Sequence, residues 1–209
     1  MSTHIETMRP FFNTPPLQLI AITAYGEARG EGERGMQAVI NVIHNRRLHP
    51  IEGRRRPRFG DNLILEATQS AYHAVILSRL QFCPFRPGDG MRPTMEILAS
   101  PVNFERELRN RASLRIAWAL CDRLRMGQLP DITGGADHFL NPHVAAATAR
   151  LWDGYPNMRA TATIGRHRFW QIIPPLSENP QVYRPSPRFV HEPVPAIVPA
   201  AAGLMMLGG

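Results

Sequence analysis

The sequence predicts a mainly α-helical domain with a small β element and an extended, proline-rich tail. Apolar residues recur at helical spacing in the segments that begin at Leu17, Met36 and Leu114. Prolines recur from Pro174 onward, which excludes regular helix there and favours extended chain. A chain of 209 residues that is 44% hydrophobic can bury one core. We expect an N-terminal arm over 1–14, one folded domain over 15–173 and a tail over 174–209.

The first predicted helix begins after Thr14. Two prolines follow this residue, and a hydroxyl N-cap followed by proline is typical of a helix start. The apolar positions that follow at helical spacing are Leu17, Ile20, Ala21 and Ala24. Gly30 and Gly32 are expected to end the helix and to leave open backbone.

Glu27 lies where the apolar stripe of this helix runs into the glycines. Continuing the stripe places Glu27 or Ala28 on the buried face. A carboxyl group held against apolar side chains resists ionisation, so its pKa rises and it can act as a general acid near neutral pH. The alternative is a solvated residue near a helix end. Tyr25, two residues earlier, is expected to pack beside the acid.

Further apolar segments follow in order. A second helix is predicted by Met36, Val39, Ile40 and Ile43. A third helix is predicted by Leu114, Trp118, Cys121 and Leu124, and it leads into Gly127. On this helix Cys121 is expected in the core.

The motifs that connect these elements are Tyr25–Glu31 (YGEARGE), His44–Arg47 (HNRR), Gln81–Cys83 (QFC), Thr133–Pro142 (TGGADHFLNP) and Ile164–Phe169 (IGRHRF). In order and spacing they resemble the SleB/CwlJ-type cell-wall hydrolases, the family of the spore cortex-lytic enzymes. The resemblance runs from about Leu17 to Trp170. Cys83 stands where serine is usual, and the regions 47–72 and 84–113 are longer than typical, which changes the shape of the groove.

The resemblance implies a fold similar to lysozymes and lytic transglycosylases, with Glu27 as the catalytic acid. The implied substrate is peptidoglycan, cut between N-acetylmuramic acid and N-acetylglucosamine. The residues that would line the glycan groove are Gln81, Phe82, Thr133, Gly134, Gly135, Ala136, His138, Phe139 and Asn141. His138 would orient Glu27 or a sugar, or else hold its own turn, and Tyr25 would pack beside the acid or bind sugar.

Glycoside cleavage usually needs two carboxylates. Glu31 is expected at the solvent, Glu33 in the first turn of the second helix, and Asp137 inside the TGGA segment. No partner for Glu27 emerges, which favours a lytic transglycosylase in which one glutamate is first acid and then base. A hydrolytic muramidase or glucosaminidase, and a non-catalytic virion or wall-binding protein, stay open.

The sequence gives little support for a metal site or for a catalytic cysteine. The sequence has no H-E-x-x-H motif, and His138, His143 and His167 are expected to serve in hydrogen bonds or packing. No metal and no organic cofactor is therefore expected. Cys83 precedes proline and has no neighbouring base in the sequence that would activate it.

The net charge is +7, and the sequence contains arginine but no lysine. The arginines at 46, 47, 54, 55, 56 and 58 are expected to form one basic loop. Such a surface attracts anionic polymers, here peptidoglycan carboxylates or lipopolysaccharide phosphates. No nucleic-acid-binding motif accompanies the charge, so no specific nucleic acid is expected.

The first 16 residues lack the features of a secretory signal. For a wall enzyme this favours a phage lysin, made in the host cytoplasm and carried to the periplasm or cell wall by a holin or by the virion. A bacterial protein exported by another route stays open. The apolar end of the tail is too short to span a bilayer. It is either disordered or docks on a virion protein or a membrane surface.

Overall fold

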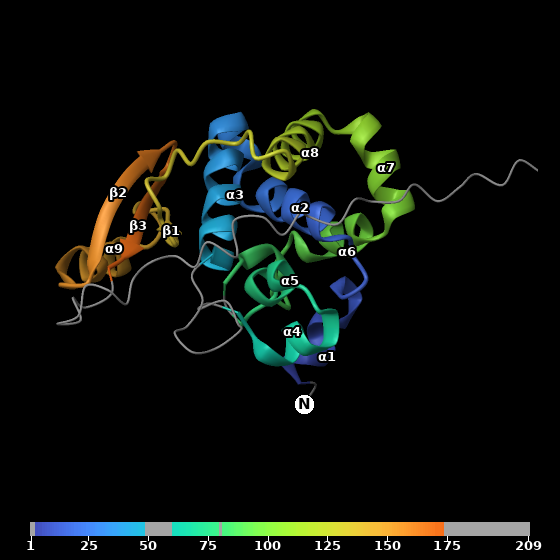
Figure 1. Ribbon diagram of the computed structural model, residues 1–209, viewed down its shortest axis with the longest axis horizontal. Helices are drawn as coiled ribbons and strands as arrows, with labels where there is room; N and C mark the ends of the chain where they lie inside the picture. The colour runs from blue at the N-terminus through green and yellow to red at the C-terminus, as the bar shows by residue number, and fades with distance from the viewer. Residues whose placement is uncertain (1–2, 49–59, 80, 174–209) are drawn as a thin grey trace, which may run out of the picture.

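The computed structural model describes residues 3–48, 60–79 and 81–173, and it confirms a mainly helical protein with a small sheet (Figure 1). The predicted tail over 174–209 and the arginines at 54–58 lie outside the described residues. None of the helices in the described part of the chain has the length and hydropathy that a membrane crossing requires.

The helices and 3-10 turns are α1 (His4–Met8), η1 (Arg9–Phe11), α2 (Pro16–Ala28), η2 (Arg29–Glu31), α3 (Gly32–Leu48), α4 (Asn62–Thr68), α5 (Ala71–Ile76), η3 (Cys83–Phe85), α6 (Arg92–Ala99), α7 (Pro101–Asn110), α8 (Ala112–Arg125) and α9 (Ala146–Gly154). The strands are β1 (His138–Leu140), β2 (Met158–Ile164) and β3 (His167–Ile172). In Figure 1 the sheet and α9 lie on one side of α3, and the other helices lie on the opposite side.

Helix α2 is buried on all its faces, whereas the sequence predicted a single buried stripe. Its polar side chains are satisfied internally, because Gln18 Nε2 donates to the carbonyl of Leu98 (2.7 Å) and Thr23 Oγ1 donates to that of Leu19 (2.6 Å). The predicted cap at Thr14 is wrong: Pro15 is the N-cap residue, and the Thr14 hydroxyl bonds to the carbonyl of Ala99. A hydrogen bond to a distant segment thus replaces the predicted helix cap at Thr14.

Helix α3 joins two hydrophobic cores. Met36 and Ile40 pack in the main helical core, while Ala38 and Val42 pack against Ile164 and other residues of the sheet side. Phe139 packs against both clusters. Because neighbouring positions along a helix point in different directions, α3 can be buried from two sides.

The sheet is antiparallel with the strand order β1-β3-β2. Phe139 pairs with Phe169 and stacks on its ring, with 5.8 Å between the centroids. His138 pairs with Trp170, and both rings pack edge-on against Trp152 of α9. Successive residues of a strand face opposite sides of a sheet, so Phe139 faces the α3 side and His138 the α9 side.

The segment predicted as an N-terminal arm is packed on the domain. Met8 and Phe11 belong to the main core, and the Phe11 ring lies edge-on to Phe85 with 4.9 Å between centroids. Burial of these side chains removes apolar surface from water and holds α1 and η1 in place.

The expectation that Glu31 lies at the solvent is wrong. Its side chain is only 6% exposed, and its carboxylate lies 2.8 Å from His167 Nδ1 at the start of β3. Gly165 makes this approach possible: its φ is +58°, and a Cβ there would lie 3.1 Å from Glu31 Cδ. Glu31 therefore ties the β2–β3 turn to η2.

Gly165→Ala should lower the free energy of unfolding by about 1–3 kcal/mol, because alanine is strained at this φ and its methyl would displace the Glu31 carboxylate. Gly127→Ala is the matched control, since Gly127 also has a positive φ (+69°) but has no atom near the added methyl. Urea unfolding of both variants measures the difference. Equal losses would show that Glu31 does not need the space at Gly165.

Candidate active site

The structure places Glu27 in the last turn of α2, against the segment that begins η3. Glu27 Oε1 accepts a hydrogen bond from the backbone N–H of Cys83, with 2.8 Å between nitrogen and oxygen. Gly26 allows this approach, because a Cβ there would lie 2.7 Å from Pro84 Cγ. The absence of a side chain at Gly26 thus lets η3 pack directly on the helix that carries the acid.

Burial gives Glu27 the titration that a general acid needs. Desolvation raises its pKa from 4.5 to about 7. The Cys83 N–H and the charges of Arg86 and Arg46 act in the opposite direction, while the charge of Asp89 raises the pKa further. At neutral pH the carboxyl group is therefore divided between its acidic and basic forms, as proton transfer in both directions requires.

Arg46 is buried beside this site and is not part of a basic loop. It lies within α3, is 4% exposed, and donates from Nε to the carbonyl of Asp137 (2.6 Å). Its guanidinium lies over the Phe82 ring, 5.2 Å from the centroid. Burial lowers the pKa of Arg46 to about 10, so it stays charged at neutral pH. The predicted basic loop is therefore wrong at Arg46 and at Arg47, which also belongs to α3.

The TGGA segment is a loop held by its own polar groups. Asp131 accepts hydrogen bonds from the backbone N–H (2.7 Å) and the hydroxyl of Thr133, and from the N–H of Gly135. Asn45 Nδ2 donates to the carbonyl of Ala136 (2.9 Å). Thr133 and Ala136 are fully buried, so they hold the loop in this structure, whereas Gly134 is exposed. Their predicted contact with glycan stays a prediction.

The remaining predicted groove residues fall into different places. Phe82 is buried and packs against Phe139, with 6.3 Å between the ring centroids. His138 Nδ1 lies 2.6 Å from Asp137, and its ring packs on Trp152. Gln81 is half-buried, and Asn141 Oδ1 accepts from the N–H of His143. The structure thus brings Phe139 against Phe82, the residue before Cys83, with Phe139 and not His138 on that side of the sheet.

Tyr25 and Cys121 have packing roles. Tyr25 is 6% exposed, and its hydroxyl accepts a hydrogen bond from Arg111 (3.0 Å). Cys121 lies in the core, as predicted. Burial raises the pKa of the Cys83 thiol, which disfavours the thiolate that a cysteine nucleophile needs. Among the described residues, no cluster of His, Cys, Asp and Glu has the arrangement to hold a metal ion.

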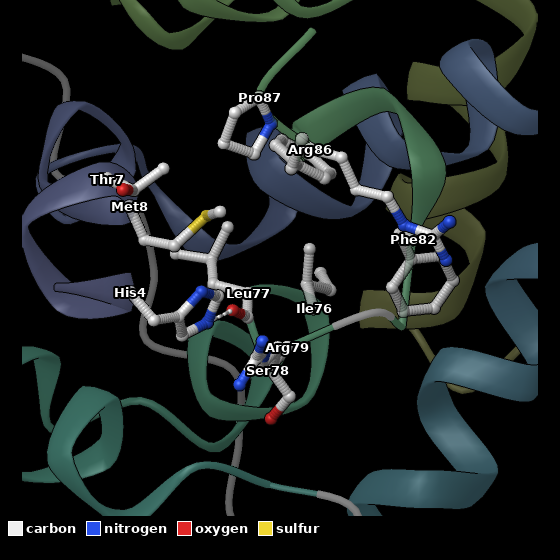
Figure 2. Close-up of a pocket in the computed structure, with 11 residues that line it drawn as sticks. His4, Thr7, Met8, Ile76, Leu77, Ser78, Arg79, Phe82, Arg86 and Pro87 are labelled. Atoms are coloured by element: carbon white, nitrogen blue, oxygen red, sulfur yellow. Dashed lines mark hydrogen bonds between the residues drawn. The ribbon is translucent and has the colours of Figure 1, made fainter. Parts of the chain in front are cut away.

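A hollow of about 540 Å³ lies beside the η3 segment (Figure 2). Phe82 and Arg86 line it together with His4 and Met8 of α1, while Glu27 is not a lining residue. Figure 2 shows the Arg86 side chain extending toward the Phe82 ring. The segment that presents the Cys83 N–H to Glu27 therefore has its Phe82 and Arg86 side chains on this hollow.

Comparison with known families agrees with the resemblance found in the sequence. The family model described as cell wall hydrolase matches residues 30–170. The chain belongs to the cell wall hydrolase family. Membership supports a cell wall lytic enzyme whose substrate is peptidoglycan. The chain matches none of the curated proteins and none of the solved structures with which it was compared.

The matched region of this cell wall hydrolase begins just after Glu27, so the role of the acid rests on its own surroundings and on the motif. Sequence reasoning missed three charged groups that act on the pKa of Glu27, namely Arg86, Asp89 and Arg46. Asp89 lies in the long inserted region, where the family pattern offers no guide. Arg46 had a usable signal, since it is the first arginine of the HNRR motif at the end of an apolar helix.

Glu27→Gln should stabilise this cell wall hydrolase at alkaline pH but not at acid pH. The pKa of Glu27 is higher in the folded protein than in the unfolded chain, so stability is full below about pH 4.5 and falls as the pH rises to about 7. The neutral amide removes this loss, which amounts to up to about 3 kcal/mol. Urea unfolding at about pH 4 and pH 8 measures the effect. An equal change at both pH values would contradict the raised pKa.

Proposed function

We propose that this chain cleaves peptidoglycan glycan strands between N-acetylmuramic acid and N-acetylglucosamine, as a lytic transglycosylase with Glu27 as acid and then base. The observation that carries the proposal is the partly buried Glu27, whose pKa of about 7 suits both roles at neutral pH. The family membership supports the substrate, and the Cys83 N–H fixes the orientation of the carboxyl group.

The reaction balances without a cofactor. Protonated Glu27 donates its proton to the glycosidic oxygen as the bond from that oxygen to C1 of the muramic acid breaks. The C6 hydroxyl of the same sugar attacks C1 and passes its proton to the Glu27 carboxylate. The products are a 1,6-anhydromuramic end and a free 4-hydroxyl on N-acetylglucosamine, and Glu27 is again protonated.

A hydrolytic muramidase or glucosaminidase is the second candidate, and Asp89 favours it. The charge of Asp89 raises the pKa of Glu27, so the two carboxyl groups interact electrostatically. Asp89 Oδ1 accepts a hydrogen bond from the N–H of Met91 (2.8 Å), which fixes its side chain. In this mechanism Asp89 would activate a water molecule, and the product would be a reducing end.

The setting in which the enzyme acts is also part of the proposal. We propose that it is a phage lysin that reaches the cell wall through a holin or with the virion. The tail over 174–209 would then contact a virion protein or a membrane surface. A non-catalytic virion or wall-binding protein is the remaining alternative, and the loss of Glu27 distinguishes it.

Purified protein incubated with sacculi should release anhydromuropeptides, detected by mass spectrometry, and Glu27→Gln should reduce this release by at least about 100-fold. Activity should fall as the pH rises through about 7, because the acid loses its proton. Glu33→Gln is the control, since Glu33 is an exposed carboxylate at the start of α3. No release by the folded wild type, together with unchanged wall binding in Glu27→Gln, would instead support the non-catalytic alternative, and full activity of Glu27→Gln would contradict the role of Glu27.

Asp89→Asn separates the two chemistries. Under transglycosylation it should leave the anhydro product in place and lower the pKa of Glu27, because the amide removes a negative charge that raises it. The alkaline limb of the pH profile would then move to lower pH. If wild-type products carry reducing ends and Asp89→Asn abolishes them, the enzyme is a hydrolase with Asp89 as the base.

A further inference from the structure

The buried carboxylate of Glu31 has a site built for it. It lies 2.8 Å from His167 Nδ1, and its Oε2 accepts no hydrogen bond from the described residues. Two glycines make room for it, because a Cβ at Gly35 would lie 2.5 Å from Glu31 Cβ and one at Gly165 would meet the carboxylate. Burial of a carboxylate costs free energy. The two glycines and the histidine that accommodate Glu31 therefore indicate a role beyond a surface contact.

His167 connects Glu31 to a row of aromatic rings. The imidazole packs edge-on against Phe139, with 5.3 Å between centroids, and Phe139 packs against Phe82 at 6.3 Å. The next residue is Cys83, whose N–H bonds to Glu27. An unbroken series of contacts thus runs from Glu31 to the oxygen of Glu27.

Arg46 holds this row from the other side. Its guanidinium covers the Phe82 ring, and its Nε binds the carbonyl of Asp137, two residues before Phe139 along the chain. Phe82 is 2% exposed, so it is fixed between Arg46 and Phe139. Close-packed interiors transmit small displacements, and a shift of His167 would therefore reach the Cys83 amide.

We propose that Glu31 is a positioning residue which, through His167, Phe139 and Phe82, holds the Cys83 amide against Glu27. This inference rests on the proposed role of Glu27. Without Glu31, the β2–β3 turn loses its tie to η2, the aromatic row relaxes, and the amide no longer orients the carboxyl group. A mispositioned acid lowers turnover more than substrate binding.

The direction in which the pKa of Glu27 shifts distinguishes a positioning role of Glu31 from a simple effect of its charge. Loss of the Cys83 N–H bond raises the pKa of Glu27, whereas loss of the negative charge of Glu31 could only lower it. The other charges that act on Glu27, from Arg46, Arg86 and Asp89, are unchanged by the substitution.

The experiment compares Glu31→Ala with the wild type in two measurements. In the sacculus assay, kcat should fall about 10- to 100-fold with KM nearly unchanged, and the alkaline limb of the pH profile should move to higher pH. Independently of activity, the Cys83 amide resonance should titrate with a midpoint near pH 7 in the wild type, and at a higher pH with a smaller amplitude in Glu31→Ala.

Arg166→Ala is the matched control, because Arg166 lies in the same turn, is 68% exposed and approaches Glu31 only to 3.9 Å. It should change neither measurement. Phe139→Leu interrupts the aromatic row while keeping an apolar side chain, so it tests the same path if Glu31→Ala does not fold. An unchanged or lower midpoint in Glu31→Ala or Phe139→Leu would overturn the inference. An active Glu27→Gln would instead overturn the proposed function.

Discussion

The burial of α3 from two sides is the constraint on which the rest of the structure depends. Met36 and Ile40 pack in the helical core with residues of α2. Ala38 and Val42 pack in the smaller core beside the sheet. Small residues at these positions let the sheet side approach closely. The end of the same helix presents Asn45 and Arg46 to the TGGA loop. Helix, sheet and loop are therefore placed relative to one another by a single element.

The site combines buried charge with local support. Glu27 and Arg46 are held within packed surroundings, where each charge costs free energy unless it is compensated. The Cys83 N–H compensates Glu27, and the Asp137 carbonyl together with the Phe82 ring compensates Arg46. Burial raises the pKa of Glu27 into the neutral range, so the same free-energy cost gives the group its acid–base character. Stability is given up where the chemistry requires it.

Much of the fold could be predicted because local pattern decides it. The helical class, the core position of Cys121 and the raised pKa of Glu27 all followed from apolar spacing. The errors concern contacts between distant segments. Thr14 bonds to the carbonyl of Ala99 instead of capping its own helix, and Glu31 meets His167 of the β2–β3 hairpin. No pattern within one segment could reveal a partner so far along the chain.

The sequence by itself determined the helices, the motif order and the candidate catalytic carboxyl group, because periodicity and local composition act over one or two turns of chain. Only the tertiary structure decided which side chains stand beside that carboxyl group. Strand alternation turned Phe139 and not His138 toward Phe82, and the inserted region supplied Asp89. The physical reason is that packing and desolvation depend on neighbours brought together by folding, which spacing along the chain does not encode.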